Sequence, residues 1–248
     1  MSLLPWQWAL AAASAFLFGV SKTGVPGLGI LPVVMILWVI PDGRLSGGAV
    51  LPLLCVADLF AVRFYRHHAR WDELWRLSPF VGAGLLAGLL ALHFTAGTAV
   101  LDRLMGGLLL AMVVLQAQRL RRGDPPVPQR RWLAGVFGVT AGFATTVANA
   151  AGPVMSLYLL TMGLEKDAFI GTAAWFFLII NLVKVPLFLL PGAQRITPET
   201  LQLDFWLLPL VIAGALAGRA LFRRIDARAF AWAVLLLAAA GTLKLLWR

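Results

Sequence analysis

Long runs of uncharged, mostly apolar residues recur along the whole chain, separated by short polar connections. A helix needs about 20 such residues to cross the hydrocarbon core of a bilayer. The pattern therefore predicts helices that have lipid as their solvent. Ten apolar segments can be drawn, at about residues 6–21, 27–41, 46–65, 75–94, 99–119, 132–147, 151–163, 168–190, 204–222 and 228–246.

The composition strengthens this interpretation. Hydrophobic residues make up 60% and charged residues 13% of the 248 positions, which is about half the charge of a typical soluble domain. We therefore expect an all-α, polytopic membrane protein. No basic residue precedes the first apolar segment, so we expect it to remain in the mature protein rather than to be cleaved as a signal peptide. Cys55 is the single cysteine, which excludes an intrachain disulfide.

The net charge of +10 raises the alternative of a nucleic-acid partner. The arginines, however, lie between the apolar segments, as they do in cytoplasmic loops, and no soluble basic domain is present. We therefore expect the lipid bilayer as partner and no nucleic acid. Placing the connections 63–76 and 119–131 in the cytoplasm gives fourteen basic residues inside and five outside. In this orientation both termini lie outside.

The two halves of the chain resemble each other. Each contains five apolar segments, and an odd number reverses the orientation of the second half in the membrane. The sequence thus predicts two inverted repeats, residues 1–123 and 124–248, although Gly/Ala/Leu-rich helices also resemble each other by chance. The matching segments are GILPVVMILWV (29–39) with AAGPVMSLYLL (150–160), GAVLPLLCVADLFAV (48–62) with GTAAWFFLIINLVKV (171–185), and AGLLAG (83–88) with AGALAG (213–218).

Each half begins with a pair of segments that is short for two full crossings. The uncharged stretch 132–164 has 33 residues and carries TTVANAAGP (145–153) in its middle. Each arm of about 16 residues would span about 24 Å, against a hydrocarbon core of about 30 Å. The stretch 5–41 is similar and carries SKTGVPGLGILP (21–32). We expect a broken or re-entrant helix pair at the start of each repeat.

These two breaks form the predicted substrate site, because interrupted helices at equivalent positions mark the binding site in secondary transporters. Where a helix restarts, its first backbone N–H groups lack helical partners and, with the helix dipole, attract an anion. The alternative is that the glycines simply allow close helix packing. The break residues assigned to the site are Gly24, Gly27, Gly29, Pro32 and Pro153.

Two lysines lie within apolar segments. Lys184 shares a helix face with Asn181, and an intramembrane lysine is costly enough to indicate a function, here attraction of an anion. The alternative is that its ammonium group extends to the outer surface. For Lys22 the sequence leaves two roles open: it lines the site, or it is a positive charge at the inner membrane surface. Asp58 is the one acid that we assign to proton coupling, with neutralisation of Lys184 or Arg63 as the alternative.

The second break also carries polar side chains that suit a substrate site. Thr145, Thr146 and Asn149 offer hydroxyl and amide groups, unless the threonines bond to helix carbonyl groups. His67 and His68 are predicted in a solvated loop, so no metal site is expected. The apolar segments hold no nucleophile–base pair and no paired carboxylates, and we expect neither an enzyme nor a cofactor.

The segments FGVSKTGVPGLGILPV (18–33) and GTAAWFFLIINLVKVPLF (171–188) resemble the sulfite exporter (TauE/SafE) family of bacterial membrane proteins. The resemblance extends over nearly the whole chain. It implies export of small sulfur-containing anions, such as sulfite or organosulfonates, across the bacterial cytoplasmic membrane. The second half departs from the first in lacking its glycines, so the two breaks need not bind equivalently.

The sequence as a whole predicts a secondary active exporter of small sulfur anions, driven by a proton gradient or by the membrane potential. A passive anion channel is the main alternative, and an intramembrane enzyme that acts on lipids is a weaker one. The sequence leaves open the identity of the anion and the oligomeric state, with a homo-oligomer as one option.

Overall fold

The computed structural model describes residues 3–24, 29–95, 99–122, 131–190, 195–221 and several positions between 232 and 243. The regular elements of these residues are all helical, as apolar runs require in lipid, where a helix satisfies its own backbone. They are α1 (Pro5–Thr23), α2 (Ile30–Val39), α3 (Gly43–Tyr65), the 3₁₀ turn η1 (Arg66–His68), α4 (Trp71–Thr95), α5 (Ala99–Arg122), α6 (Arg131–Ala148), α7 (Gly152–Thr161), α8 (Lys166–Leu189) and α9 (Pro198–Leu221).

Four stretches of the described chain are long and apolar enough to cross a membrane. They correspond to α3 with η1, α4, α8 and α9. This confirms the prediction of an all-α, polytopic membrane protein. The last predicted segment, 228–246, lies largely outside the described residues.

Two helices begin several residues before the apolar segments that predicted them. The apolar segments start at about residues 75 and 204, whereas α4 begins at Trp71 and α9 at Pro198. The first turns of these helices are polar and contain Asp72, Glu73 and Glu199. Acidic residues suit a helix N-terminus because of its partial positive charge. Apolarity therefore marks the membrane-embedded part of each helix rather than its end.

The pairs α1–α2 and α6–α7 are the two broken segments. The short helices α2 and α7 have 10 residues each, or about 15 Å, which is half of a bilayer core. The chain of α2 folds back along α1: Ser14 Oγ donates to Pro32 O (2.8 Å), and Gln7 Nε2 donates to Val39 O (3.3 Å). The α1–α2 pair is therefore a helical hairpin, and its second arm is too short to cross the bilayer alone.

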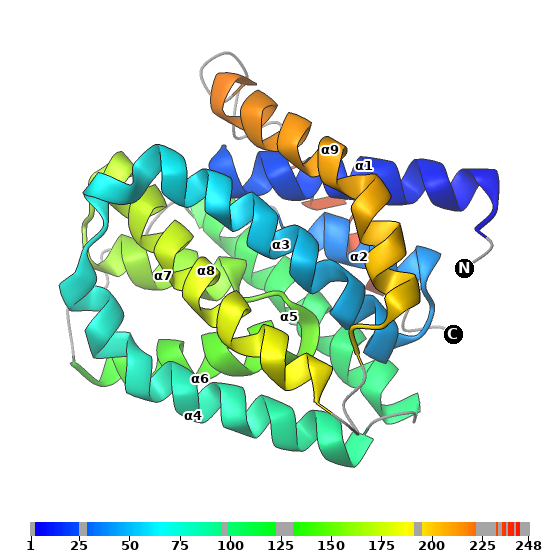
Figure 1. The fold of residues 1–248 in the computed structure, drawn as a ribbon. Coiled ribbons are helices and arrows are strands. Elements are labelled where there is room, and N and C mark those ends of the chain that lie inside the picture. The colour runs from blue at the N-terminus through cyan, green and yellow to red at the C-terminus, as the bar shows by residue number, and fades with distance from the viewer. Residues whose placement is uncertain are drawn as a thin grey trace.

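The most extensive helix–helix packing occurs in two pairs that lie along opposite edges of the molecule, α1 with α9 and α4 with α6 (Figure 1). Gly214 of α9 lies against the carbonyl oxygen of Phe16, and Gly84 of α4 lies against that of Val139. Neither glycine has room for a Cβ atom, as expected where small residues let helix backbones approach. Gly214 and Gly84 occupy equivalent positions in AGALAG and AGLLAG, so equivalent glycines make equivalent contacts.

A second pair of contacts follows the same pattern. Gly48 of α3 lies against the backbone of Arg195, which precedes α9, and Gly171 of α8 lies against the backbone of Tyr65, which precedes η1 and α4. Gly48 and Gly171 are the first residues of matched sequence segments. These reciprocal contacts support the inverted repeat, which stays a prediction. The boundary that we assigned between residues 123 and 124 lies in 123–130, outside the described residues.

We expect Gly84→Ala to lower stability by about 1–3 kcal/mol, because its methyl group must displace the α6 backbone. The matched control is Gly82→Ala in the same helix, where no described atom beyond the adjacent backbone of α4 lies within 4 Å of the added carbon. Thermal unfolding in detergent measures the difference. Equal melting temperatures for the two variants would contradict the assigned packing.

Candidate functional site

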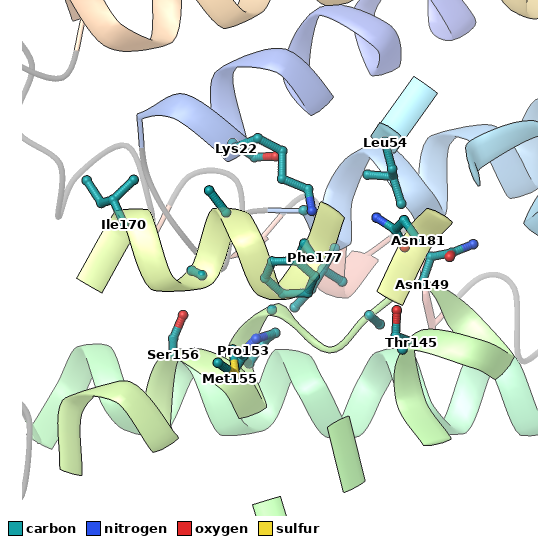
Figure 2. Close-up of a pocket in the computed structure, with 17 residues that line it drawn as sticks. Lys22, Leu54, Thr145, Asn149, Pro153, Met155, Ser156, Ile170, Phe177 and Asn181 are labelled. Carbon is teal, nitrogen blue, oxygen red and sulfur yellow. The ribbon is translucent and has the colours of Figure 1, made fainter. Parts of the chain in front are cut away.

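A cavity of about 50 Å³ lies where the two broken segments meet α3 and α8. It is large enough for a small ion or a few water molecules. The ends of α1 and α6, the starts of α2 and α7, and one side of α8 surround it (Figure 2). Its polar lining residues are Ser21, Lys22, Thr145, Asn149, Ser156 and Asn181.

Both restarting helices present their N-termini to this cavity. Gly29 is the N-cap of α2, Gly152 is the first residue of α7, and both line the cavity. Among the described residues, no side chain caps the N–H groups at either helix start. Pro153 fits the second position of α7 because the missing N–H is not needed there. Uncapped donors and the positive ends of two helix dipoles therefore lie around one small space.

Lys22 contributes a cation to the same space. Its Nζ lies 2.8 Å from Asp58 Oδ1 and 3.8 Å from the centroid of the Phe177 ring. Figure 2 shows the side chain extending from α1 toward Phe177 and Asn181 of α8. Asn181 Nδ2 donates to the other oxygen of Asp58 (2.7 Å). The Asp58 carboxylate, which has no exposed surface, is thus held by α1 and α8 together.

Lys184 has a different role from Lys22. Its Nζ donates to Thr145 O (3.0 Å), Thr145 Oγ1 (3.1 Å) and Asn149 Oδ1 (2.7 Å). An ammonium group has three donors, so these acceptors saturate it. Lys184 has no exposed surface and therefore does not extend to the membrane surface. It fastens the second break to α8.

The backbone at this second break is unusual. Asn149 has a φ of 50°, in the left-handed region that asparagine tolerates better than most residues. Its Nδ2 donates to Gly47 O of α3 (3.1 Å) while its Oδ1 accepts from Lys184. Contacts from two separate helices thus hold the turn between α6 and α7.

The residues that the sequence assigned to the site fall into two groups. Lys22, Gly29, Thr145, Asn149, Pro153 and Asn181 line the cavity. The remaining described residues are not part of the cavity lining, and Gly27 lies outside the described residues. The described residues outside the lining are Gly24, Pro32, Asp58, Thr146 and Lys184.

Some of these residues have the alternative roles named in the sequence analysis, such as helix packing or hydrogen bonding within their own helix. A Cβ on Gly24 would lie 2.8 Å from Gly218 O, which is a packing contact with α9. Thr146 Oγ1 donates to Gly142 O one turn earlier in its own helix (2.7 Å). Pro32 O accepts the hydroxyl of Ser14. The ion-pair partner of Asp58 is Lys22, rather than Lys184 or the exposed Arg63.

Sequence reasoning did not find Phe177 and Ser156, which also line the cavity. Phe177 lies one helical turn before Asn181, and Ser156 lies three residues after Pro153. Residues at these spacings share a helix face, so the signal was present in the sequence. In a helix that is apolar all round, however, the spacing alone does not distinguish a site residue from a core residue.

A sequence profile of the family described as sulfite exporter TauE/SafE matches residues 10–245, which includes every cavity residue named above. The chain belongs to this family. No curated protein and no solved structure matches it. The sulfite exporter TauE/SafE family consists of membrane transporters rather than enzymes. Membership confirms the resemblance seen in the sequence. The cavity is therefore interpreted below as part of a transporter.

We expect Lys184→Met to destabilise the second break, since it removes the donor to the buried Thr145 Oγ1 and to the part-buried Asn149 Oδ1, at about 1–3 kcal/mol for each acceptor left unpaired. The matched control is Val183→Met at the adjacent, 46% exposed position. Thermal unfolding and transport assays in parallel test this role. If both methionine variants melt and transport alike, Lys184 does not support the break.

Proposed function

We propose that this member of the TauE/SafE family is a secondary transporter that exports small sulfur-containing anions, such as sulfite or organosulfonates, across the bacterial cytoplasmic membrane. The cavity between the two broken helix pairs is its substrate site. Family membership supports the transport function and the sulfur anion. The site itself rests on the geometry.

One observation carries the assignment of the site. The uncapped N-termini of α2 and α7 and the ammonium group of Lys22 border one cavity of about 50 Å³. Helix N-termini bind anions through free N–H groups and through the helix dipole. Irregular backbone at membrane depth is tolerated where it is buried in protein or lines a cavity. A small anion satisfies both the donors and the charge.

The position of Gly29 allows a direct test of the cavity. Beyond its chain neighbours, the nearest described atom to a Cβ built on it is Ser21 Oγ at 3.9 Å, and its φ of −66° suits any residue. We expect Gly29→Leu to fold normally but to obstruct the cavity and the start of α2. Uptake of radiolabelled sulfite into proteoliposomes should fall at least about tenfold, equivalent to 1.4 kcal/mol.

Gly29→Ala is the matched control, because its smaller side chain leaves more of the cavity open. It should retain more transport than Gly29→Leu, and both variants should melt near the wild-type temperature. Full transport by a folded Gly29→Leu variant would contradict the assignment of this cavity as the substrate site.

Transporter and passive channel are distinguished by the direction of net movement. A coupled carrier accumulates the anion against its own gradient when a pH gradient is imposed across sealed vesicles. A channel lets the anion equilibrate with the membrane potential and with its own concentration. We expect uphill accumulation of sulfite that stops when an ionophore removes the pH gradient. Unchanged accumulation after its removal, with the membrane potential clamped, would contradict proton coupling.

A further inference from the structure

The ion pair between Lys22 and Asp58 connects the cavity to a buried acid. Lys22 lines the cavity and its side chain is 13% exposed, whereas the side chain of Asp58 is 0% exposed. The two charged groups are 2.8 Å apart. An anion that enters the cavity and binds this ammonium group therefore competes with the carboxylate for the same charge.

No other cation in the described part of the chain can replace Lys22 beside Asp58. Lys184, on the neighbouring helix α8, already donates to Thr145 and Asn149. Within the described residues, Asn181 of α8 donates to Oδ2 of the carboxylate, and the buried Cys55 lies one turn earlier in α3. When the Lys22 charge is shared with an anion, Asp58 is left with one amide hydrogen bond.

The physical consequence is a change in protonation. Removing the partner of a buried ion pair costs about 3–5 kcal/mol when the remaining charge stays uncompensated. A buried carboxylate avoids this cost by taking a proton. A second negative charge beside Lys22 acts in the same direction, since like charges disfavour the ionised form of each other. These effects hold whether the anion displaces Asp58 or binds next to it.

We propose that Asp58 takes up a proton when a small sulfur anion binds at Lys22, so that anion binding and protonation of this buried acid are linked. The proton comes from water and forms an O–H bond on the carboxylate, while the ammonium–carboxylate pair gives way to an ammonium–anion pair. For a monoanion, the loaded site carries no additional net charge. The inference rests on the proposed function, because it takes the cavity as the anion site.

Proton uptake can be counted directly by isothermal titration of the purified full-length protein in detergent. The probe is methanesulfonate, which stays a monoanion from weakly acidic to weakly alkaline pH and so takes up no proton itself. Repeating the titration in buffers with different ionisation enthalpies gives the number of protons bound. We expect about one proton per anion, with the dissociation constant rising toward about tenfold per pH unit on the alkaline side.

The Asp58→Asn variant is the matched control, since it keeps the shape of the side chain and an oxygen for Asn181. It should bind methanesulfonate with no proton uptake, a flat pH dependence and a lower dissociation constant than the wild type. Lys22→Met combined with Asp58→Asn should bind neither the anion nor the proton. Sulfite is titrated in parallel, and the difference between wild type and Asp58→Asn isolates the protein's proton from that of sulfite.

The possible failures are distinguishable. Wild-type binding of either anion without proton uptake by the protein overturns the coupling and leaves the proposed function intact. Absence of binding of both anions to wild type and to Asp58→Asn overturns the anion site, and the coupling with it. With methanesulfonate, the wild-type proton count does not depend on whether any variant folds.

Discussion

The backbone of a membrane protein must find hydrogen-bond partners inside the protein wherever a helix is interrupted, because lipid offers none. The turn between α6 and α7 shows how this constraint organises the molecule. Lys184 of α8 donates to Thr145 and Asn149, and Asn149 in turn donates to Gly47 of α3. The residues that hold this break also bring α3 and α8 to the cavity. The same residues thus support the interrupted backbone and form the site.

The charged side chains around the cavity are also better explained by binding than by stability. Two lysines and one aspartate, Lys22, Lys184 and Asp58, are buried or nearly so and leave an excess of one positive charge when all three are ionised. A buried ion pair is weak evidence for stability, since desolvation offsets the attraction between its charges. A site that attracts an anion needs such an excess, and two helix N-termini add to it. The electrostatics therefore fit binding better than they fit stability.

The helices were largely predictable because lipid imposes a simple rule on them. An uncharged run of sufficient length becomes a helix, and the described helices follow the predicted segments closely. The starts of α4 and α9 were not predictable from apolarity, because their first turns are polar. The glycines at 84 and 214 were visible as part of a repeated sequence. Their contacts with the backbones of α6 and α1 required the folded structure.

The candidate site shows the same division between sequence and structure. The membrane environment follows from the apolar pattern of the chain. The two breaks and the intramembrane polar residues at or near them were predictable because each departs from that pattern. Which polar groups meet depends on how the helices pack. That packing pairs Asp58 with Lys22 and directs Lys184 to the second break. These pairings join residues far apart in the chain, and helix periodicity gives the face on which a side chain lies but not the helix that packs against it.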